Sequence, residues 1–223
     1  TGQPTYFASD IAYHKEKFTG GYDLVIDVLG SNHHGHVPKL RALSKIFGFN
    51  PEKFVVILYQ YVRVKRGAEA VKMSKRAGTY VTAQEVLDEV GPDNMIFFLL
   101  MNSTSSHLDF DLELAKEQSQ KNPVYYVQYA HARCASILRE AQNRGLYILD
   151  SKLQAPRLPN GGQASSKLLQ ENEELRLIKY LLRFPEVVED TAHDYQVQRI
   201  PHYALELSRA FHNFYEKQRV ITD

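Results

Sequence analysis

The first part of the chain changes from helical to strand-like spacing of its apolar residues. Residues 6–18 carry apolar side chains at loosely helical intervals, and the pair Gly20 and Gly21 ends that pattern. Residues 23–29 form a short, apolar, β-branched run, which is typical of a buried strand. These patterns predict a helix followed by a strand.

A second helix and a second strand follow. Residues 30–36 are polar and contain glycine, which predicts a turn. Apolar residues then return at helical spacing over residues 38–47, with Pro38 near the start and Gly48 after the end. Residues 54–64 predict one further, longer strand. Strand, turn, helix and strand together predict a right-handed parallel βαβ unit.

Helical spacing dominates the rest of the chain. We expect two short helices over residues 81–90 and 92–101, the first capped by Thr79 or Thr82. Beyond residue 110, helical patterns follow one another, and Asn122 with Pro123 is suited to open a long helix. Two further amphipathic helices are predicted over residues 168–184 and 201–220, after a loop rich in proline and glycine at 151–167. The second half therefore predicts an all-α bundle.

Composition is that of an ordinary soluble globular protein, with 43% hydrophobic and 24% charged residues among 223. The formal net charge is +1, from 27 basic and 26 acidic residues, which argues against binding nucleic acid by bulk charge alone. One local exception is the segment of residues 63–76, which contains six basic residues and one acidic residue. Composition leaves open whether this run is a basic binding patch or a solvated loop.

Three features bear on location. The longest apolar run, residues 95–101, is too short to span a bilayer, and residues 1–13 lack the pattern of a signal peptide. The single cysteine, Cys134, excludes an internal disulfide and fits a reducing compartment. We therefore expect a cytoplasmic protein with no membrane partner.

The strongest chemical motif is Lys72-Met73-Ser74-Lys75, which resembles the Lys-Met-Ser-Lys loop of class I aminoacyl-tRNA synthetases. In that reaction negative charge builds on the pyrophosphate that leaves ATP, and a lysine on a loop can stabilise that charge. The resemblance implies that Lys75 contacts pyrophosphate, that Lys72 and Ser74 support it, and that Met73 lies at the ATP site. The alternative is a solvated basic loop.

Four segments extend the resemblance to one family, the bacterial type of arginyl-tRNA synthetase. They occur in the family's order, at residues 5–14, 30–36, 72–78 and 122–133. The resemblance covers essentially the whole chain. It implies an α/β part followed by an all-α part. These would be the second half of a Rossmann-like class I catalytic domain (residues 1–110) and a helical-bundle anticodon-binding domain (residues 111–223), truncated at its C-terminus.

The resemblance also assigns residues to arginine and ATP. Tyr6 and Asp10 match a Tyr-x-x-x-Asp pair that binds arginine, and a carboxylate is a suitable partner for a guanidinium or ammonium group. A capped surface helix is the alternative for this pair. His33 matches an arginine contact, while Gly30 and Asn32 match the ATP segment, in which the family more often has Asp than Asn at position 32.

The helix expected after Asn122 is crowded with aromatic residues. Tyr126 and Tyr129 are candidates to stack on bases of an anticodon loop, and Arg133 is a candidate phosphate contact. Helical geometry requires about half of the tyrosines of this segment to lie in the core.

The implied function is ATP-dependent ligation of arginine to its tRNA through arginyl-adenylate, with Mg²⁺ accompanying ATP and no permanently bound cofactor. The family's His-x-Gly-His motif is expected upstream of Thr1, since His33–His36 only superficially resembles it. We therefore expect a fragment that is inactive by itself. Two alternatives remain: a non-catalytic tRNA-binding module, and a metal hydrolase using His33, His34 and His36. Without a cysteine nearby we favour hydrogen-bonding roles for these histidines and expect no metal site.

Overall fold

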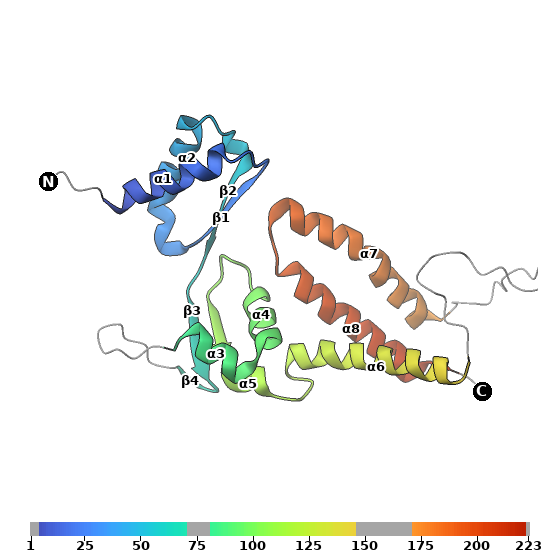
Figure 1. Ribbon diagram of the computed structural model, residues 1–223. Coiled ribbons are helices and arrows are strands. Elements are labelled where there is room, and N and C mark those ends of the chain that lie inside the picture. Colours follow the sequence, from blue (N-terminus) through green and yellow to red (C-terminus); the bar gives the residue numbers. More distant parts are fainter. Residues whose placement is uncertain (1–4, 71–80, 146–170, 222–223) are drawn as a thin grey trace, which may run out of the picture. The chain divides into compact units, whose positions relative to one another are not determined.

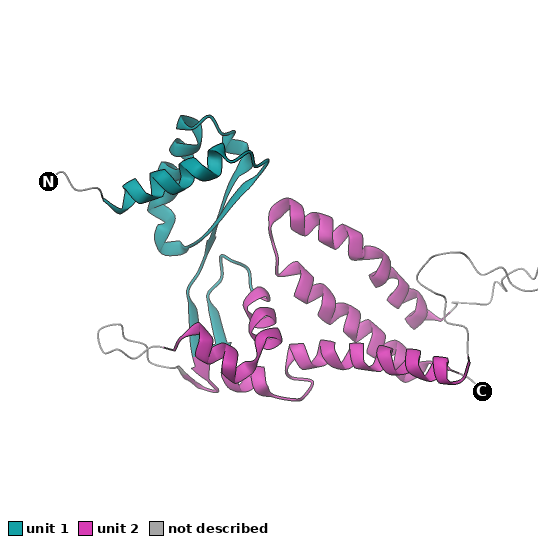
Figure 2. Cartoon of the chain, in the orientation of Figure 1, with its two compact units in different colours: residues 1–64, 102–110 teal, residues 65–101, 111–223 magenta. Residues whose placement is uncertain are grey.

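The computed structural model describes residues 5–70, 81–145 and 171–221 (Figure 1). The chain separates into two compact units, coloured separately in Figure 2. Unit 1 contains residues 1–64 and 102–110, and unit 2 contains residues 65–101 and 111–223. The boundary predicted between a catalytic domain and an anticodon-binding domain at residues 110 and 111 stays a prediction. The two units reflect which parts of the backbone lie close together, not which function they have.

Unit 1 contains the predicted βαβ arrangement. Its elements in chain order are α1 (Tyr6–Thr19), β1 (Val25–Gly30), the 3₁₀ helix η1 (Ser31–His36), α2 (Val37–Ile46), the 3₁₀ helix η2 (Pro51–Lys53) and β2 (Phe54–Tyr59). Strands β1 and β2 are parallel, and Val25 is opposite Phe54 in the register. The first helix, the first strand and the second helix predicted from spacing are confirmed, and so is the start of a second strand at Phe54; the polar turn after β1 is a 3₁₀ helix.

The core of unit 1 lies on one face of the β1–β2 pair. It combines residues from α1, β1, α2 and β2, namely Phe18, Val25, Leu40, Leu43 and Phe54. The Phe18 ring packs edge-on against Phe54 with 5.0 Å between centroids, in the geometry that aromatic pairs prefer. Both helices thus cover the face to which Val25 points, while alternate β1 side chains point the other way.

Residues 54–64 do not form one strand, so that prediction was wrong. β2 ends at Tyr59, and a separate strand β3 (Val62–Arg66) begins two residues after Gln60. The Gln60 backbone N–H donates to the Thr104 carbonyl at 2.9 Å instead of continuing the ladder with β1. β3 is the middle strand of a second sheet, between β4 (Glu69–Ala70) and β5 (Leu108–Asp111).

The remaining elements of unit 2 are helical (Figure 1). They are α3 (Ala83–Val90), α4 (Pro92–Leu100), α5 (Leu112–Lys116), α6 (Pro123–Asn143), α7 (Asn172–Asp194) and α8 (Arg199–Lys217). Two predicted caps are confirmed. The Thr82 side chain accepts from the Glu85 N–H in a capping box, and Asn122 Oδ1 accepts from the Val124 N–H at 2.9 Å.

Helix α7 is longer than the sequence pattern predicted. It continues through Pro185 to Asp194, so the expected end at Phe184 was wrong. Proline removes the helix hydrogen bond to the Leu181 carbonyl, yet the helix continues. The Tyr203 hydroxyl of α8 donates to the neighbouring Tyr180 carbonyl at 2.8 Å and ties this part of α7 to α8. No helix in the described ranges has the length and apolarity needed to traverse a bilayer.

Candidate functional site

The residues expected to bind arginine begin on α1. Tyr6 is the first residue of the helix and its side chain is 96% exposed. Asp10 follows one turn later, so both side chains start from the same face of the helix. Tyr6 is exposed and Asp10 is half-buried, and a phenol and a carboxylate at this spacing suit a cationic ligand.

The second expected segment begins where β1 ends. Gly30 is the last residue of β1, and Asn32 and His33 follow in η1. A Cβ atom at position 30 would lie 2.7 Å from Asn32 Oδ1, so glycine lets the Asn32 side chain fold back over the strand end. Asn32 and His33 are exposed, and the His33 ring lies edge-on to His36 at 5.9 Å.

The four residues of the Lys-Met-Ser-Lys motif lie outside the described residues; they are Lys72, Met73, Ser74 and Lys75. The residues that precede and follow it are described. Gly67, with a positive φ of 62°, turns β3 into β4, and its N–H donates to Asp111 Oδ1 at 3.1 Å. On the other side, Thr82 caps α3.

The described part of the basic run at residues 63–76 is paired with carboxylates. Arg66 binds Glu89 at 2.7 Å and Glu113 at 2.8 Å, and Lys116 binds the same two carboxylates. Hydrogen bonds from Arg66 and then Lys116 lower the pKa of Glu89 to about 2. We call Arg66, Glu89, Glu113 and Lys116 the charge network. Arg63 pairs in turn with Asp109, at 2.8 Å.

The candidate tRNA contacts lie on α6, where they meet α8. The Tyr129 ring stacks on His212 at 5.5 Å, and Tyr126 packs edge-on against the same imidazole at 4.8 Å. All three side chains are partly buried. Burial raises the pKa of the Tyr126 phenol, so its hydroxyl stays protonated.

Arg133 is held between two tyrosines. Its guanidinium lies 4.7 Å from the Tyr129 ring centroid and 4.8 Å from that of Tyr215, and it donates to the Tyr129 hydroxyl. Hydrogen bonds to Tyr129 and Tyr215 raise the pKa of Arg133 further above its usual value. The guanidinium is therefore in contact with two aromatic rings and hydrogen-bonded to both of their hydroxyls.

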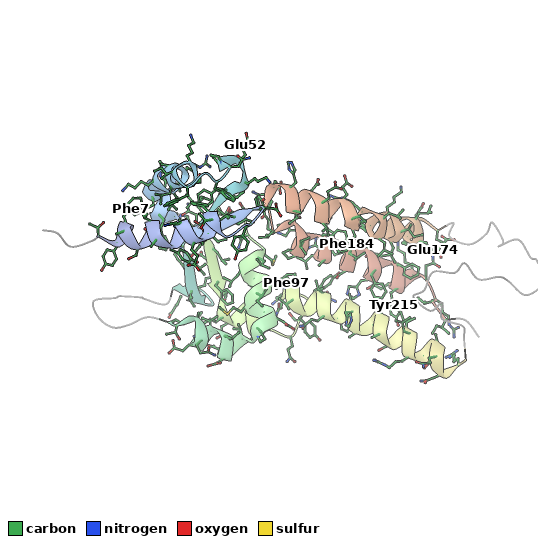
Figure 3. All side chains as sticks on the ribbon, turned by 45° about the horizontal axis from the view of Figure 1, so that its top comes forward. Phe7, Glu52, Phe97, Glu174, Phe184 and Tyr215 are labelled. Carbon is green, nitrogen blue, oxygen red and sulfur yellow. The ribbon has the colours of Figure 1, made fainter. Side chains whose placement is uncertain are left out.

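These side chains line a groove of about 850 Å³ between the end of α6 and the end of α8. Tyr215, labelled in Figure 3, contributes from α8. The groove is lined by Tyr129, Ala132, Arg133, Ser136, Ile137, Glu140 and residues 215–221. We call it the α6–α8 groove. It combines aromatic faces with positive and negative groups, a mixture suited to a flat polar ligand such as a nucleic-acid base.

Several of these residues were not expected to be functional. Tyr215 of α8 lines the groove, and His212, one turn earlier on α8, packs against Tyr129. His14 and Asp27 form a buried pair, with 2.7 Å between His14 Nε2 and Asp27 Oδ2. The only signal that could have pointed to Asp27 was a charged residue in the middle of the apolar run 23–29, and it was not used.

Comparison with known proteins places the chain in a family. Residues 127–223 match the DALR anticodon binding domain. Across its whole length the chain is 48% identical to the arginine–tRNA ligase of Syntrophotalea carbinolica and 45% identical to that of Moorella thermoacetica. The chain belongs to the arginyl-tRNA synthetase family. It spans 38% of the length of these curated relatives.

Solved structures of the family agree with this fold. All of the chain superposes on 46% of a putative arginyl-tRNA synthetase from Campylobacter jejuni, with a TM-score of 0.80 and 31% identity. The Thermus thermophilus arginyl-tRNA synthetase gives a TM-score of 0.63 at 22% identity, over 98% of this chain and 42% of its own length. The order of an α/β part and an all-α part is thus confirmed as a family arrangement.

Proposed function

We propose that the chain is part of an enzyme that joins arginine to its tRNA at the expense of ATP, through arginyl-adenylate. The observation that carries the proposal is the 48% identity to an arginine–tRNA ligase over the entire chain. In this proposal unit 1 contributes to a Rossmann-like nucleotide-binding domain, and α6, α7 and α8 form the anticodon-binding part. A cytoplasmic location belongs to the same proposal.

The catalytic step needs positive charge where the pyrophosphate leaves. The arginine carboxylate attacks the α-phosphorus of ATP, the bond to pyrophosphate breaks, and the leaving group carries the charge away. We assign Lys75 to that charge, with Lys72 and Ser74 in support and Met73 beside ATP. Mg²⁺ enters as part of the ATP substrate.

Arginine and ATP recognition are assigned to the two exposed segments of unit 1. The Asp10 carboxylate would pair with a cationic group of arginine, flanked by Tyr6 on α1 and approached by His33 from η1. Gly30 and Asn32 would lie at the ATP. The support is chemical, since a free carboxylate on α1 and polar side chains at the end of β1 suit these ligands.

Recognition of tRNA is assigned to the α6–α8 groove. Tyr129 lines the groove, and we assign base contacts to it and to Tyr126, which lies outside the groove lining and packs on His212. Arg133 contributes a guanidinium beside the rings of Tyr129 and Tyr215, and we assign to it a contact with a base or phosphate. The near-zero net charge leads us to expect weak, salt-sensitive binding by the chain alone.

A binding experiment with the 223-residue chain tests this assignment. Fluorescence anisotropy with labelled tRNA for arginine should show that Tyr129→Leu weakens binding by about tenfold, since stacking on an aromatic ring contributes ~1–3 kcal/mol per base. Tyr22→Leu is the matched control, because Tyr22 is 63% exposed on unit 1 and outside the groove. Equal binding by the Tyr129→Leu variant and the wild type would remove the groove from the proposal.

An exchange assay tests the catalytic part and separates it from a tRNA-binding module. With ATP, arginine, tRNA and labelled pyrophosphate, a full-length ligase that contains this chain should catalyse exchange, and the 223-residue chain alone should not. A full-length protein that binds tRNA without exchange would favour the non-catalytic module. Robust exchange by the chain alone would contradict the expectation that further segments complete the ATP site.

A further inference from the structure

The buried pair His14–Asp27 lies beside the residues proposed to bind arginine and ATP and is not one of them. Both side chains are almost fully buried, at 6% and 5% exposure, and they connect α1 to β1. His14 lies one turn beyond Asp10 on α1, and Asp27 lies three residues before Gly30 on β1. The pair therefore joins the two elements that carry the proposed arginine site.

Hydrogen bonds hold both ring nitrogens of the imidazole. His14 Nδ1 lies 2.8 Å from the Asp10 carbonyl oxygen, which only accepts, so Nδ1 carries a hydrogen. His14 Nε2 lies 2.7 Å from Asp27 Oδ2, while Lys17 Nζ donates to Asp27 Oδ1. Both carboxylate oxygens of Asp27 therefore have a partner.

A buried ion pair is a poor way to gain stability alone. Desolvation offsets much of the attraction, and apolar residues of similar size often stabilise as well. The imidazole contacts Phe18 and Phe54, whose ring centroids lie 5.7 and 6.3 Å from its own, so an apolar side chain would fit these neighbours. An apolar side chain would lack the two hydrogen bonds of His14, which fix where the Asp10 carbonyl lies relative to β1.

We infer that His14 and Asp27 are positioning residues that set Asp10 of α1 relative to the ligand-binding segment at the end of β1. The inference rests on the proposed arginine site. Through the bond to its carbonyl, His14 fixes the backbone from which the Asp10 carboxylate projects. Asp27 orients His14 in turn. Lys17 completes the carboxylate's hydrogen bonds, and its ammonium also lies 4.3 Å from the Tyr13 ring.

Nuclear magnetic resonance of the 223-residue chain tests the hydrogen bond from the His14 ring to the Asp10 carbonyl. The ¹⁵N shifts of wild-type His14 should show a hydrogen on Nδ1, bonded to that carbonyl. In Asp27→Asn the amide can donate to Nε2 and still accept from Lys17, so Nδ1 should keep its hydrogen. A wild-type His14 without a hydrogen on Nδ1 would overturn the inference, whatever the enzyme assays give.

Kinetics of a full-length ligase containing this chain test the positioning role. His14→Phe keeps a ring among its aromatic neighbours but loses both hydrogen bonds. It should raise the KM for arginine by about tenfold, because misplacing a substrate-binding group is costly. The KM for ATP and kcat should stay within about twofold of wild type. Asp27→Asn, which keeps the hydrogen bonds, should have the smaller effect on the arginine KM.

Two results separate this inference from the proposed function. If Asp10→Asn leaves the arginine KM unchanged, the proposed arginine site is wrong, although the protonation measured by resonance still stands. If Asp10→Asn raises that KM but His14→Phe does not, or if His14→Phe raises the ATP KM equally, the positioning role is wrong. Should His14→Phe fail to fold, the resonance spectra of the wild type and Asp27→Asn still decide.

Discussion

At the scale of single residues, the proposed catalytic chemistry is tested most directly at Lys75. In a full-length ligase, Lys75→Ala should lower the rate of arginine activation by ~10²–10³, the usual loss when one donor to a developing charge is removed. Pyrophosphate exchange at saturating arginine and ATP measures it. The effect should fall on kcat more than on either KM, because pyrophosphate carries its full charge only as it leaves.

A second lysine provides the control for charge alone. Lys121→Ala removes the same side chain from a position that is 80% exposed, with only a 3.9 Å pair to Glu117. Its exchange rate should match the wild type. Near-normal turnover of Lys75→Ala, or an equal loss in both variants, would withdraw the assignment of Lys75.

Residue types predicted some contacts and missed others. Asn122 was predicted as a cap because its amide suits free N–H groups, and such a local rule needs no tertiary information. His14 and Asp27 are 13 positions apart and meet only because α1 packs on β1. For the same reason, the sequence pattern could not predict that Tyr215 of α8 packs against Arg133.

At the scale of elements, the charge network makes a prediction about pH. Glu89 on α3 binds Arg66 of β3 and Lys116, and its pKa of about 2 lies below the ordinary 4.5. A lowered pKa means that the ionised carboxylate stabilises the folded state. That contribution is fully present above pH 4.5 and is lost as the pH falls from 4.5 towards 2.

Urea unfolding of Glu89→Gln measures that contribution. At pH 7 and low salt the variant should be less stable than wild type by about 1 kcal/mol or less, because the pairs are partly exposed. The difference should shrink at pH 3 and in 1 M salt, about the concentration at which charges are strongly screened. Asp88→Asn, one position away on α3, should show a smaller change. A difference independent of pH would contradict an electrostatic role.

Elements were predictable where spacing was long and regular. The helices α3, α4, α6 and α8 followed from apolar periodicity and caps, as did the parallel β1–β2 pair. The short strands β4 and β5 have two and four residues, too few for a periodic signal. β3 was merged with β2 because both are rich in valine, and only pairing partners distinguish them.

At the scale of the whole molecule, the described residues of the parallel pair β1–β2 expose apolar side chains on the face opposite the core of unit 1. The side chains of Ile26 and Val28 point away from the core of unit 1 and are 40% and 61% exposed. In the register they lie beside Val55 and Ile57 of β2, so the apolar surface extends across both strands. Parallel sheets are normally buried on both faces. The chain covers 38% of the length of its curated relative, so that relative contains further segments.

Substitution of Val28 tests whether other parts of a full-length ligase cover this face. In the 223-residue chain, Val28→Lys should change stability by no more than about 0.5 kcal/mol, as surface substitutions do. In the full-length protein the same lysine would be buried without a partner. It should destabilise the folded state by several kcal/mol, measured as a lower denaturation midpoint. Ile46→Lys, at a 72% exposed position ending α2, is the matched control and should be mild in both proteins. If Val28→Lys is equally mild in the full-length protein, the face is open to solvent there, and unit 1 is not an inner part of a larger parallel sheet.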